Sequence, residues 1–478
     1  MAEISDEIFR EYDIRGIFGK DLLPETAALI AEAYAVYIKD KGVYKDGFKV
    51  SIGRDVRTSS DAIRDALARG LNQSGISVID VGVCPTPLQY FSMHTLKVDG
   101  GFMITGSHNP PEYNGFKVSV GNETIHGKEI QRLKKIIKAG LKDAPTSATG
   151  GVEKAGIITG YIDYVAANIK LAAIKKPLKL VLDSGNGTAG IVAPKLLKKL
   201  GCEVIELFSE PDGRFPNHHP DPTVPKNLKT LSETVVKEQA DFGAAYDGDA
   251  DRIGVVDEAG NIVWGDKLMV IFSRAILAKN PGATIVGEVK SSQTMYDEIK
   301  RLGGVPVMWK TGHSLIKARM KELKAAFAGE MSGHIFFADR WFGFDDAIYS
   351  SCRLAEIMAE KRAGDADFAF SALLKGVPDT FVTPEIRIDC PDKLKFEAIE
   401  RLDKAVGKGM GDFKIRDIIR IDGLRINFDG GWALVRASNT QPVLVLRFEA
   451  ESETLLEKAK GFIKEKFSEA CPEIRVGI

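Results

Sequence analysis

The chain has 478 residues, more than one hydrophobic core supports, so its length predicts three or four domains. Its 65 Lys and Arg residues nearly balance its 66 Asp and Glu residues, which argues against a general polyanion-binding protein and a nucleic-acid partner. A few convergent cations could still bind a small anionic substrate. The five scattered cysteines form no CxxC pair and indicate reduced thiols, with neither a zinc site nor a disulfide framework.

The N-terminal segment MAEISDEIFREYDIRG is acidic and polar, which is not typical of a secretory signal. No apolar run approaches the roughly 20 residues that a membrane-spanning helix needs. We therefore expect a cytoplasmic protein with no membrane partner.

The first α/β unit is predicted over residues 1–154. Apolar residues at helical spacing predict a helix over 24–41, and residues 48–52 form a short predicted strand followed by GRDVR. Helix-like and strand-like stretches then alternate up to an apolar run at 102–104 and the loop TGSHNP. A stretch rich in Pro, Ser, Thr and Gly at 144–151 predicts a linker.

The same pattern occurs twice more. In the second unit, 155–258, a strand at 180–183 is followed by an apolar strand that ends in the loop DGDADR. In the third unit, 259–376, a strand at 284–288 is followed by one that ends in GEMSGH. We predict three related α/β units that place three different loops at equivalent positions. Ligands of open α/β sheets tend to bind beyond the carboxyl ends of the strands, so the three loops could face one cleft.

The pattern changes after residue 376. Strand-like runs at 381–389 and 433–435 flank one helical stretch, and a strand at 443–449 leads into an amphipathic helix from about 452 to 467. Residues 377–478 are therefore predicted to form a smaller α+β domain.

Ser107 follows an apolar strand and precedes His108 and turn-forming residues, so it lies on a loop and not within a sheet ladder. A serine at such a position can act as a nucleophile, carry a phosphoryl group or simply form a turn. This segment alone does not decide among the three.

Asp247, Asp249 and Asp251 stand at alternate positions of one loop, where they repel one another unless a cation lies among them. An EF-hand is excluded because Arg252 occupies the position that needs glycine and because the flanking segments are strands. A solvated acidic turn is the alternative. We predict a hard divalent ion, preferably Mg²⁺, with room for a phosphate oxygen.

The C-terminal loop RASNTQP brings together a guanidinium group, two hydroxyls and a run of backbone amides, which could bind a phosphate dianion. The alternative is a hairpin turn with one surface arginine. The side chains concerned are Arg436, Ser438, Asn439 and Thr440.

The loop GEMSGH offers hydrogen-bonding groups for sugar hydroxyls in Glu330 and Ser332, and a group that could move protons in His334. A surface turn would look similar. Other polar residues that could join a site are Tyr12, Arg15, Lys117 and His313, whereas the Pro-flanked segment Asn217-His218-His219 favours a structural or substrate loop over a metal site.

A loop serine, a Mg²⁺ triad and a phosphate-binding loop together indicate phosphoryl transfer with serine as the carrier. The sequence has neither a GxxxxGK[ST] loop nor a kinase signature, so a nucleotide is not the evident donor. A sugar phosphate is the natural alternative.

The motifs TGSHNP, DGDADR, GEMSGH and RASNTQP, in this order, resemble those of the α-D-phosphohexomutase superfamily, and the likeness covers the whole chain from YDIRG onward. GEMSGH, KTGHS and FPNHHPDP are most similar to the bacterial phosphomannomutase/phosphoglucomutase branch. Phosphoglucosamine mutases usually have TASHNP and GEQSGH instead. Ala250 stands where many relatives have glycine, and we expect no effect from it.

The resemblance implies three α/β domains and a smaller fourth around a deep central cleft, and a monomer. It implies that Ser107 is a phosphoserine that completes a Mg²⁺ site with the three aspartates. It implies three further groups: catalytic residues near the reacting groups, residues that contact the sugar and the cleft, and a loop for the phosphate that is not transferred. The catalytic group is Arg15, His108, Lys117, Arg252 and His334. The group that contacts the sugar and the cleft is Tyr12, Lys290, His313, Glu330 and Ser332. The phosphate loop contributes Arg436, Ser438, Asn439 and Thr440.

The reaction implied is interconversion of hexose 1-phosphate and hexose 6-phosphate, for glucose and mannose, through a hexose 1,6-bisphosphate. One alternative is a phosphoglucosamine mutase, and another is a Mg²⁺-dependent sugar-phosphate phosphatase. A catalytically silent binding protein is disfavoured, because binding alone needs neither the serine nor the three aspartates.

Overall fold

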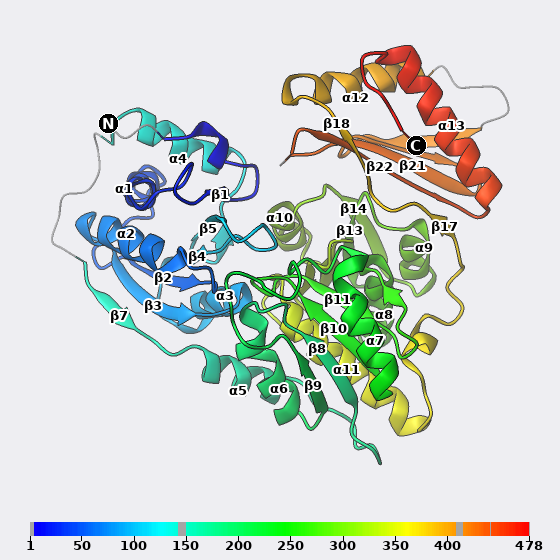
Figure 1. Ribbon diagram of the computed structural model, residues 1–478, viewed down its shortest axis with the longest axis horizontal. Helices are drawn as coiled ribbons and strands as arrows, with labels where there is room; N and C mark the ends of the chain where they lie inside the picture. Colours follow the sequence, from blue (N-terminus) through cyan, green and yellow to red (C-terminus); the bar gives the residue numbers. More distant parts are fainter. Residues whose placement is uncertain (1–3, 142–149, 408–413, 440, 478) are drawn as a thin grey trace.

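The computed structural model describes residues 4–477 except 142–149, 408–413 and 440. Four β-sheets follow one another along the chain, each accompanied by helices (Figure 1). Most of the predicted linker at 144–151 lies outside the described residues. None of the helices in the described part of the chain has both the length and the hydropathy that crossing a bilayer requires.

The first unit contains a sheet of order β1-β5-β4-β2-β3-β7, with β6 paired to β5. The last strand, β7, joins the sheet directly after the predicted linker. The elements are η1 Asp6–Ile8, β1 Ile14–Ile17, α1 Pro24–Asp40, β2 Lys49–Arg54, α2 Ser60–Gln73, β3 Ser77–Val83, α3 Thr86–Thr95, β4 Gly100–Ile104, β5 Tyr113–Val120, β6 Glu123–Thr124, α4 Lys128–Lys138 and β7 Val152–Lys154.

The second unit has the sheet order β12-β11-β10-β8-β9, and the third has β14-β13-β15-β16. The second contains α5 Ile158–Asn168, β8 Lys179–Asp183, η2 Thr188–Ile191, α6 Ala193–Lys199, β9 Glu203–Leu207, η3 Pro225–Leu228, α7 Lys229–Glu238, β10 Phe242–Tyr246, β11 Ile253–Val256 and β12 Ile262–Val263. The third contains α8 Gly265–Lys279, β13 Thr284–Glu288, α9 Gln293–Arg301, β14 Val305–Trp309, α10 His313–Leu323, β15 Phe327–Gly329, β16 Ile335–Phe337, α11 Ala347–Gly364 and η4 Phe370–Leu374.

The strand pairing confirms the predicted equivalence of the three loops. Strand β4 pairs in parallel with β2 and antiparallel with β5, and β10 pairs in the same way with β8 and β11. Strand β15 repeats this arrangement with β13 and β16. Strands β4 and β10 are buried at every position, which explains their continuous apolar sequences. The three signature loops are TGSHNP, DGDADR and GEMSGH. Each therefore connects the strand that has both a parallel and an antiparallel neighbour to that antiparallel neighbour.

The fourth unit has the sheet order β17-β22-β21-β20-β19, with β18 also paired to β22. The predicted strand at 381–389 is two short strands, and the sequence prediction missed β19 and β20. Both missed strands mix apolar with charged residues, and an Asp-Gly turn at 429–430 links β20 to β21. The elements are β17 Phe381–Val382, β18 Ile386–Asp389, α12 Asp392–Val406, β19 Ile415–Ile419, β20 Leu424–Phe428, β21 Gly431–Ala437, β22 Val443–Ala450 and α13 Glu453–Ala470.

The two largest hydrophobic clusters of the described residues organise the first three units. Helices α1, α2 and α4 pack against the first sheet and bury Ile30, Leu67 and Leu133. Helix α3 instead contributes Leu88 and Phe91 to a larger cluster that continues through the second and third units. The first three units therefore share a continuous core, whereas the fourth has a cluster of its own.

The fourth unit docks on the third through a buried arginine. Arg425 of β20 donates hydrogen bonds of 2.7 Å to the carbonyl oxygens of both Val289 and Ser291, which follow β13. Its guanidinium group lies 4.0 Å from the ring centroid of Trp432. This contact fixes the fourth unit beside the segment that carries Lys290.

Helix α11 is tied to the second unit at its first turn. Asp346 caps the helix by accepting a hydrogen bond of 2.8 Å from the backbone N–H of Tyr349, and the hydroxyl of Tyr161 in α5 donates to the same carboxylate at 2.8 Å. Burial raises the pKa of Asp346 to about 7. Ionisation of this group therefore destabilises the folded state.

Replacing Asp346 by Asn should flatten the dependence of stability on pH. The folded-state pKa of Asp346 lies above its unfolded value, so its contribution to stability is present at low pH and is lost as the pH rises from about 4 to about 7. Between pH 5 and pH 8 the wild type should lose about 2–4 kcal/mol relative to D346N. Thermal-unfolding midpoints at the two pH values measure this difference.

The matched control is Asp365→Asn, because Asp365 lies exposed just after the last residue of the same helix. This variant should follow the wild type at both pH values. Equal pH dependence of the wild type and D346N would contradict the assignment.

Candidate active site

Ser107 lies on the loop after β4, as predicted, but its side chain is only 2% exposed. Its hydroxyl donates a hydrogen bond of 2.8 Å to Oδ2 of Asp247 and lies 3.2 Å from Nδ1 of His108. The backbone φ of Ser107 is 50°, a left-handed conformation that costs a non-glycine residue roughly 1 kcal/mol. Such a conformation persists only where the surroundings hold it, and it directs the hydroxyl toward the second unit.

Arg57 is the residue that holds this loop, and the sequence analysis assigned it no role. Its buried guanidinium group donates to the carbonyl oxygens of Ser107 at 2.8 Å and Asn109 at 2.6 Å. Asp55 accepts from Nε of Arg57 at 3.0 Å and from the backbone N–H of Gly106 at 3.1 Å. The sequence feature that could have indicated this role is GRDVR, a charged turn directly after a buried strand.

Two glycines allow the loops to approach this closely. A Cβ atom on Gly106 would lie 2.5 Å from the guanidinium carbon of Arg57. A Cβ atom on Gly248 would lie 2.6 Å from the carbonyl oxygen of Ser107. Larger residues would therefore push the serine loop away from the aspartates.

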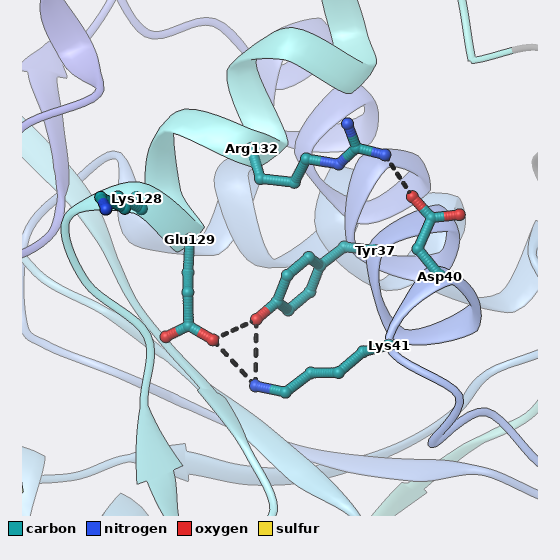
Figure 2. A pocket seen from close by; sticks show the side chains of 6 residues that line it. All are labelled: Tyr37, Asp40, Lys41, Lys128, Glu129 and Arg132. Carbon is teal, nitrogen blue, oxygen red and sulfur yellow. Dashed lines mark hydrogen bonds and ion pairs between the residues drawn. The ribbon is translucent and has the colours of Figure 1, made fainter.

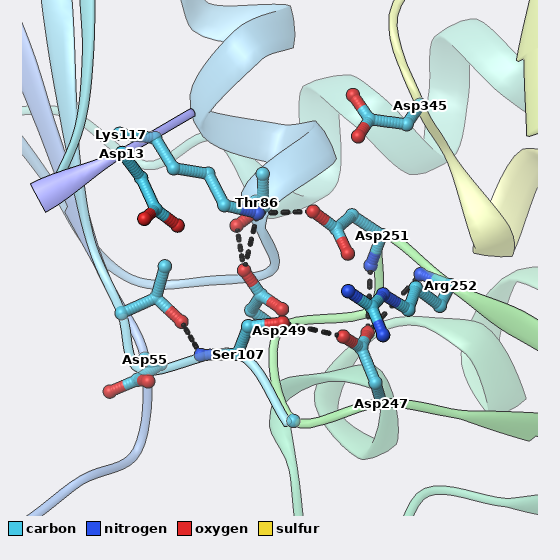
Figure 3. Close-up of polar contacts among 12 residues, drawn as sticks. Asp13, Asp55, Thr86, Ser107, Lys117, Asp247, Asp249, Asp251, Arg252 and Asp345 are labelled. Carbon is cyan, nitrogen blue, oxygen red and sulfur yellow. Dashed lines mark hydrogen bonds and ion pairs between the residues drawn. The ribbon is translucent and has the colours of Figure 1, made fainter. Parts of the chain in front are cut away.

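Asp247, Asp249 and Asp251 all lie on the β10–β11 loop and are fully buried (Figure 3). One oxygen of each lies within 4.8 Å of the others. Oδ1 of Asp249 and Oδ1 of Asp251 have no hydrogen-bond partner. Buried, unpartnered carboxylate oxygens suit a hard divalent cation, so the donor set fits the predicted metal. Ala250 adopts a φ of 59°, in the left-handed region that favours glycine.

Lys117 supplies the countercharge that the structure shows for this triad. Its ammonium group, on β5, lies 2.9 Å from Oδ2 of Asp249 and also contacts Oδ2 of Asp251. Burial lowers the pKa of Lys117, but the two carboxylates outweigh this effect and raise it well above its usual value. Thr86 donates to Asp249 at 2.6 Å. The first unit therefore completes the charge balance of a second-unit loop.

Arg15 and His108 lie beside the serine loop. Arg15, on β1, donates a hydrogen bond of 2.7 Å to Oδ1 of Asn109 and also pairs with Asp13. Burial and the neighbouring charges of Arg252 and Arg15 lower the pKa of His108 well below its usual value. His108 is therefore neutral near pH 7, next to the Ser107 hydroxyl.

Arg252 and His334 join the second and third signature loops. They form an isolated antiparallel β-bridge, and Nε of Arg252 donates to Nε2 of His334 at 2.9 Å. The ring of His313 stacks on His334 with centroids 5.2 Å apart. Three residues predicted from separate motifs therefore lie together.

Glu330 lies in the third loop, and its carboxylate accepts a hydrogen bond from the backbone N–H of Gly312. Burial, and then the charge of Glu288, raise the pKa of Glu330 to about 7. Lys290 lies 3.6 Å from Glu288 and 3.3 Å from Glu385 of the fourth unit. Ser332 lies in the same turn as Glu330 and is partly exposed.

The fourth-unit loop reaches the first and third units. Nδ2 of Asn439 donates to the hydroxyl of Tyr12 at 2.8 Å, and that hydroxyl donates to the carbonyl oxygen of Thr311 at 2.8 Å. Arg436 donates through Nε to Asp422 at 3.0 Å, and Asp422 also accepts from the backbone N–H of Thr311 at 3.0 Å. Ser438 accepts from a loop amide, whereas Thr440 lies outside the described residues.

In the described part of the chain the possible metal-binding groups are the aspartate triad and a second group of Asp251, His334 and Asp345. Neither includes the histidine pair after Asn217. His218 instead lies 3.0 Å from both oxygens of Asp183, and Asn217 donates to Asn186 at 2.8 Å. These contacts match the structural loop that the flanking prolines favoured.

A hollow on the first unit lies on helices α1 and α4, and Figure 2 shows its lining side chains. Lys41 pairs with Glu129 at 2.8 Å, and Arg132 pairs with Asp40 at 2.6 Å. These two pairs neutralise each other's charges, and Lys128 is the remaining charged side chain of the lining.

Comparison with known proteins agrees with this geometry. Four family models match in order, described as the α/β/α domains I, II and III and the C-terminal domain of phosphoglucomutase/phosphomannomutase, over residues 6–143, 159–260, 264–375 and 385–466. The chain belongs to the phosphoglucomutase/phosphomannomutase family. Each matched region contains most of one of the four sheets, with the edge strands β7, β12 and β17 outside the matches.

Two relatives and one solved structure illustrate the likeness. A phosphomannomutase/phosphoglucomutase of Pseudomonas aeruginosa is 47% identical, covering 95% of this chain and 94% of that protein. A phosphoglucomutase of Neisseria gonorrhoeae is 44% identical, covering 97% of each. The crystal structure of a phosphoglucomutase/phosphomannomutase family protein from Burkholderia thailandensis has a TM-score of 0.90 at 40% identity and covers 100% of both chains.

Replacing Asp247 by Asn should stabilise the metal-free protein and weaken cation binding. Burial and the charges of Asp249 and Asp251 raise the pKa of Asp247 well above its usual value, so its ionised form is disfavoured without a cation. With Mn²⁺ at 100 times its Kd, the wild type should gain about 2.7 kcal/mol, and the variant less than about 1 kcal/mol. Thermal unfolding with and without Mn²⁺ measures both effects.

Asp257→Asn is the control, because Asp257 is also buried but accepts hydrogen bonds only from groups in its own turn. It should keep the full gain from Mn²⁺. An undiminished gain in D247N would exclude Asp247 as a cation ligand.

Proposed function

We propose that this protein interconverts the 1-phosphates and 6-phosphates of glucose and mannose, with Ser107 as the phosphoryl carrier. The observation that carries the proposal is the Ser107 hydroxyl, buried and 2.8 Å from Asp247 within the aspartate triad. The relatives named for both sugars support the choice of substrates. A phosphoglucosamine mutase remains the alternative of the same class.

Mg²⁺ is the cation that we assign to Asp247, Asp249, Asp251 and the phosphoserine oxygen. When bound, it neutralises charge on the phosphoryl group being transferred. Lys117 and Arg252 add fixed positive charge beside the same group. Because the site is buried, these charges act in a low-dielectric environment. Burial also keeps water from the phosphoserine.

The reaction has two halves. Phosphoserine 107 transfers its phosphoryl group to the free hydroxyl of a hexose 1-phosphate, and a hexose 1,6-bisphosphate forms. The bisphosphate turns within the site, and its other phosphoryl group returns to Ser107, so that hexose 6-phosphate leaves. A bisphosphate that escaped would leave Ser107 without its phosphoryl group, so we also assign hexose 1,6-bisphosphate a role as activator.

We assign the reacting hydroxyl to a position near Arg15, Lys117 and His334. Lys117 is supported as an electrostatic group, because the aspartates keep it charged. His108 lies close enough to Ser107 to hydrogen-bond its oxygen while remaining neutral. His334 contributes an imidazole, a side chain that can both accept and donate a proton.

We assign substrate recognition to two groups of residues. Glu330 and Ser332 bind sugar hydroxyls, with Tyr12, Lys290 and His313 around them. The second group binds the phosphate that is not transferred, and comprises Arg436, Ser438, Asn439 and Thr440. Since the substrate reacts in two orientations, the same group must bind the 1-phosphate in one and the 6-phosphate in the other. A separate fourth unit suits this task because it can open for reorientation.

Ser107→Ala should abolish mutase turnover while the protein remains folded, because the hydroxyl contributes little to the core. An assay coupled to glucose 6-phosphate oxidation, started with glucose 1-phosphate and a trace of the bisphosphate, measures turnover. Mass spectrometry should find no phosphorylation at this position. Near-full activity of the variant would show that another group carries the phosphoryl group.

Arg436→Ala should raise KM about 10- to 100-fold and leave kcat within about threefold, because its charge-assisted contact with the phosphate exists in ground and transition states alike. The control is Arg416→Ala on the same unit, where the side chain is exposed on β19. A large loss of kcat at unchanged KM would contradict the phosphate-binding role.

A further inference from the structure

Glu288 is the last residue of β13, the strand that lies between β14 and β15 in the third sheet. Both neighbours run parallel to β13, so the segments that follow the three strands leave the sheet at the same edge. The side chain of Glu288 is fully buried at this edge. Glu288 is not among the residues predicted from the sequence, and the proposed reaction does not use it.

The carboxylate of Glu288 accepts one hydrogen bond from the segment after each neighbouring strand. Its Oε1 accepts from the backbone N–H of Met331, in the loop after β15, at 2.9 Å. Its Oε2 accepts from the hydroxyl of Thr311, which lies shortly after β14. Each oxygen therefore has a partner of its own, and one side chain sets the distance between the two segments.

A further hydrogen bond joins the same two segments to each other. The carboxylate of Glu330 accepts from the backbone N–H of Gly312, in the segment after β14. The residue that follows Glu330 is Met331, whose N–H donates to Glu288. Glu330 is thus held through its side chain on one side and through its main chain on the other. Met331 also lies directly between the two residues assigned to sugar hydroxyls, Glu330 and Ser332.

The backbone that carries Glu288 is itself held by neighbouring groups. Its carbonyl oxygen accepts a hydrogen bond of 2.7 Å from the hydroxyl of Tyr296 in α9. Lys290 lies 3.6 Å from Oε1 of Glu288 and keeps a second partner in Glu385 at 3.3 Å. The carbonyl oxygen of Lys290 accepts from Arg447 of the fourth unit. Glu288 therefore holds the two loops from a fixed base.

We propose that Glu288 is a positioning residue for sugar recognition, which sets the place of Glu330 and Ser332 and so the strength with which the site binds the hexose hydroxyls. The proposal rests on the proposed function, in which these two residues contact the sugar. Glu288 itself needs no contact with substrate. Because the sugar contacts exist in the bound substrate and in the transition state alike, Glu288 acts on substrate binding and not on phosphoryl transfer.

Glu288→Ala should raise KM for glucose 1-phosphate at least about tenfold and change kcat less than about threefold. Glu288→Gln should stay within about threefold of the wild-type KM, because its amide oxygen can accept from Met331 and its amide nitrogen can donate to the Thr311 hydroxyl. An unchanged KM in the Ala variant, or a Gln variant as impaired as the Ala variant, would overturn the proposal.

The matched control is Glu298→Ala, which removes a buried glutamate of the same unit that pairs with Arg274 and Arg301 in place of the site loops. This variant should keep KM within about twofold of the wild type. A rise in KM as large as that of E288A would show a general effect of losing a buried glutamate from this unit, and would overturn the proposal.

The double variant E288A/E330A tests whether Glu288 acts through Glu330. Residues that act through one another have non-additive effects. The double variant should therefore have a KM within about threefold of E330A alone. If the two single effects on KM multiplied, Glu288 would act independently of Glu330, contrary to the proposal.

A milder pair of variants keeps the proposal testable if E288A folds poorly. Thr311→Val removes the hydroxyl that donates to Glu288, and Thr311→Ser keeps it. T311V should raise KM about three- to tenfold, as expected for loss of one buried hydrogen bond, and T311S less than about twofold. Equal KM values in the two variants would overturn the proposal.

NMR of ¹⁵N-methionine-labelled protein without substrate reads the loop directly, with Met331 assigned from the M331L spectrum. A backbone N–H that donates to a carboxylate resonates downfield, so E288A should move the Met331 proton signal upfield, whereas E298A should leave it in place. An unmoved Met331 signal in E288A would overturn the proposal.

This measurement needs no turnover, so it separates failure of the proposal from failure of the proposed function. A wild type without mutase activity, together with a shifted Met331 signal in E288A, would reject the proposed function while the placement of the loop by Glu288 stood. An active wild type with an unchanged KM in E288A would reject the role of Glu288 alone.

Discussion

The charge collected around Ser107 is the constraint on which the rest of the structure depends. Three buried aspartates lie on one loop, and a phosphoryl group would add further negative charge beside them. Buried carboxylates are tolerated only with nearby countercharges. Lys117 from the first unit provides one, and Arg252 follows directly after the triad. The site therefore exists only when the first and second units are docked, which accounts for their shared core.

The repeated topology explains how each unit contributes a different kind of side chain to one site. Three sheets place a hairpin loop after the same kind of strand, and these loops carry the Ser107 hydroxyl, the three aspartates and the Glu330 carboxylate in turn. The fourth unit breaks the pattern, since its loop contacts Tyr12 through Asn439 from outside the shared core, and Asp422 of a second turn contacts Thr311. If this loop binds phosphate as proposed, its place on a unit with its own core lets it move without disturbing the triad.

The sequence predicted the residues whose chemistry is concentrated in short motifs, including Ser107, the aspartate triad and the neighbours Arg252 and His334. It did not predict the contacts of Arg57, because they are made to a segment about fifty residues away that only packing reveals. The two missed strands of the fourth unit have mixed apolar and charged sequences without a clear period. Pairing makes them strands: β20 pairs with β21, and β19 pairs with β20.

The most direct test follows a mixture of glucose, mannose and glucosamine 1-phosphates by ³¹P NMR, with purified protein, Mg²⁺ and a trace of glucose 1,6-bisphosphate. The account predicts conversion of the glucose and mannose compounds to their 6-phosphates without release of inorganic phosphate. Preferential turnover of the glucosamine compound would place the protein among the phosphoglucosamine mutases. Accumulating inorganic phosphate would contradict the central claim, because the buried serine would then pass its phosphoryl group to water.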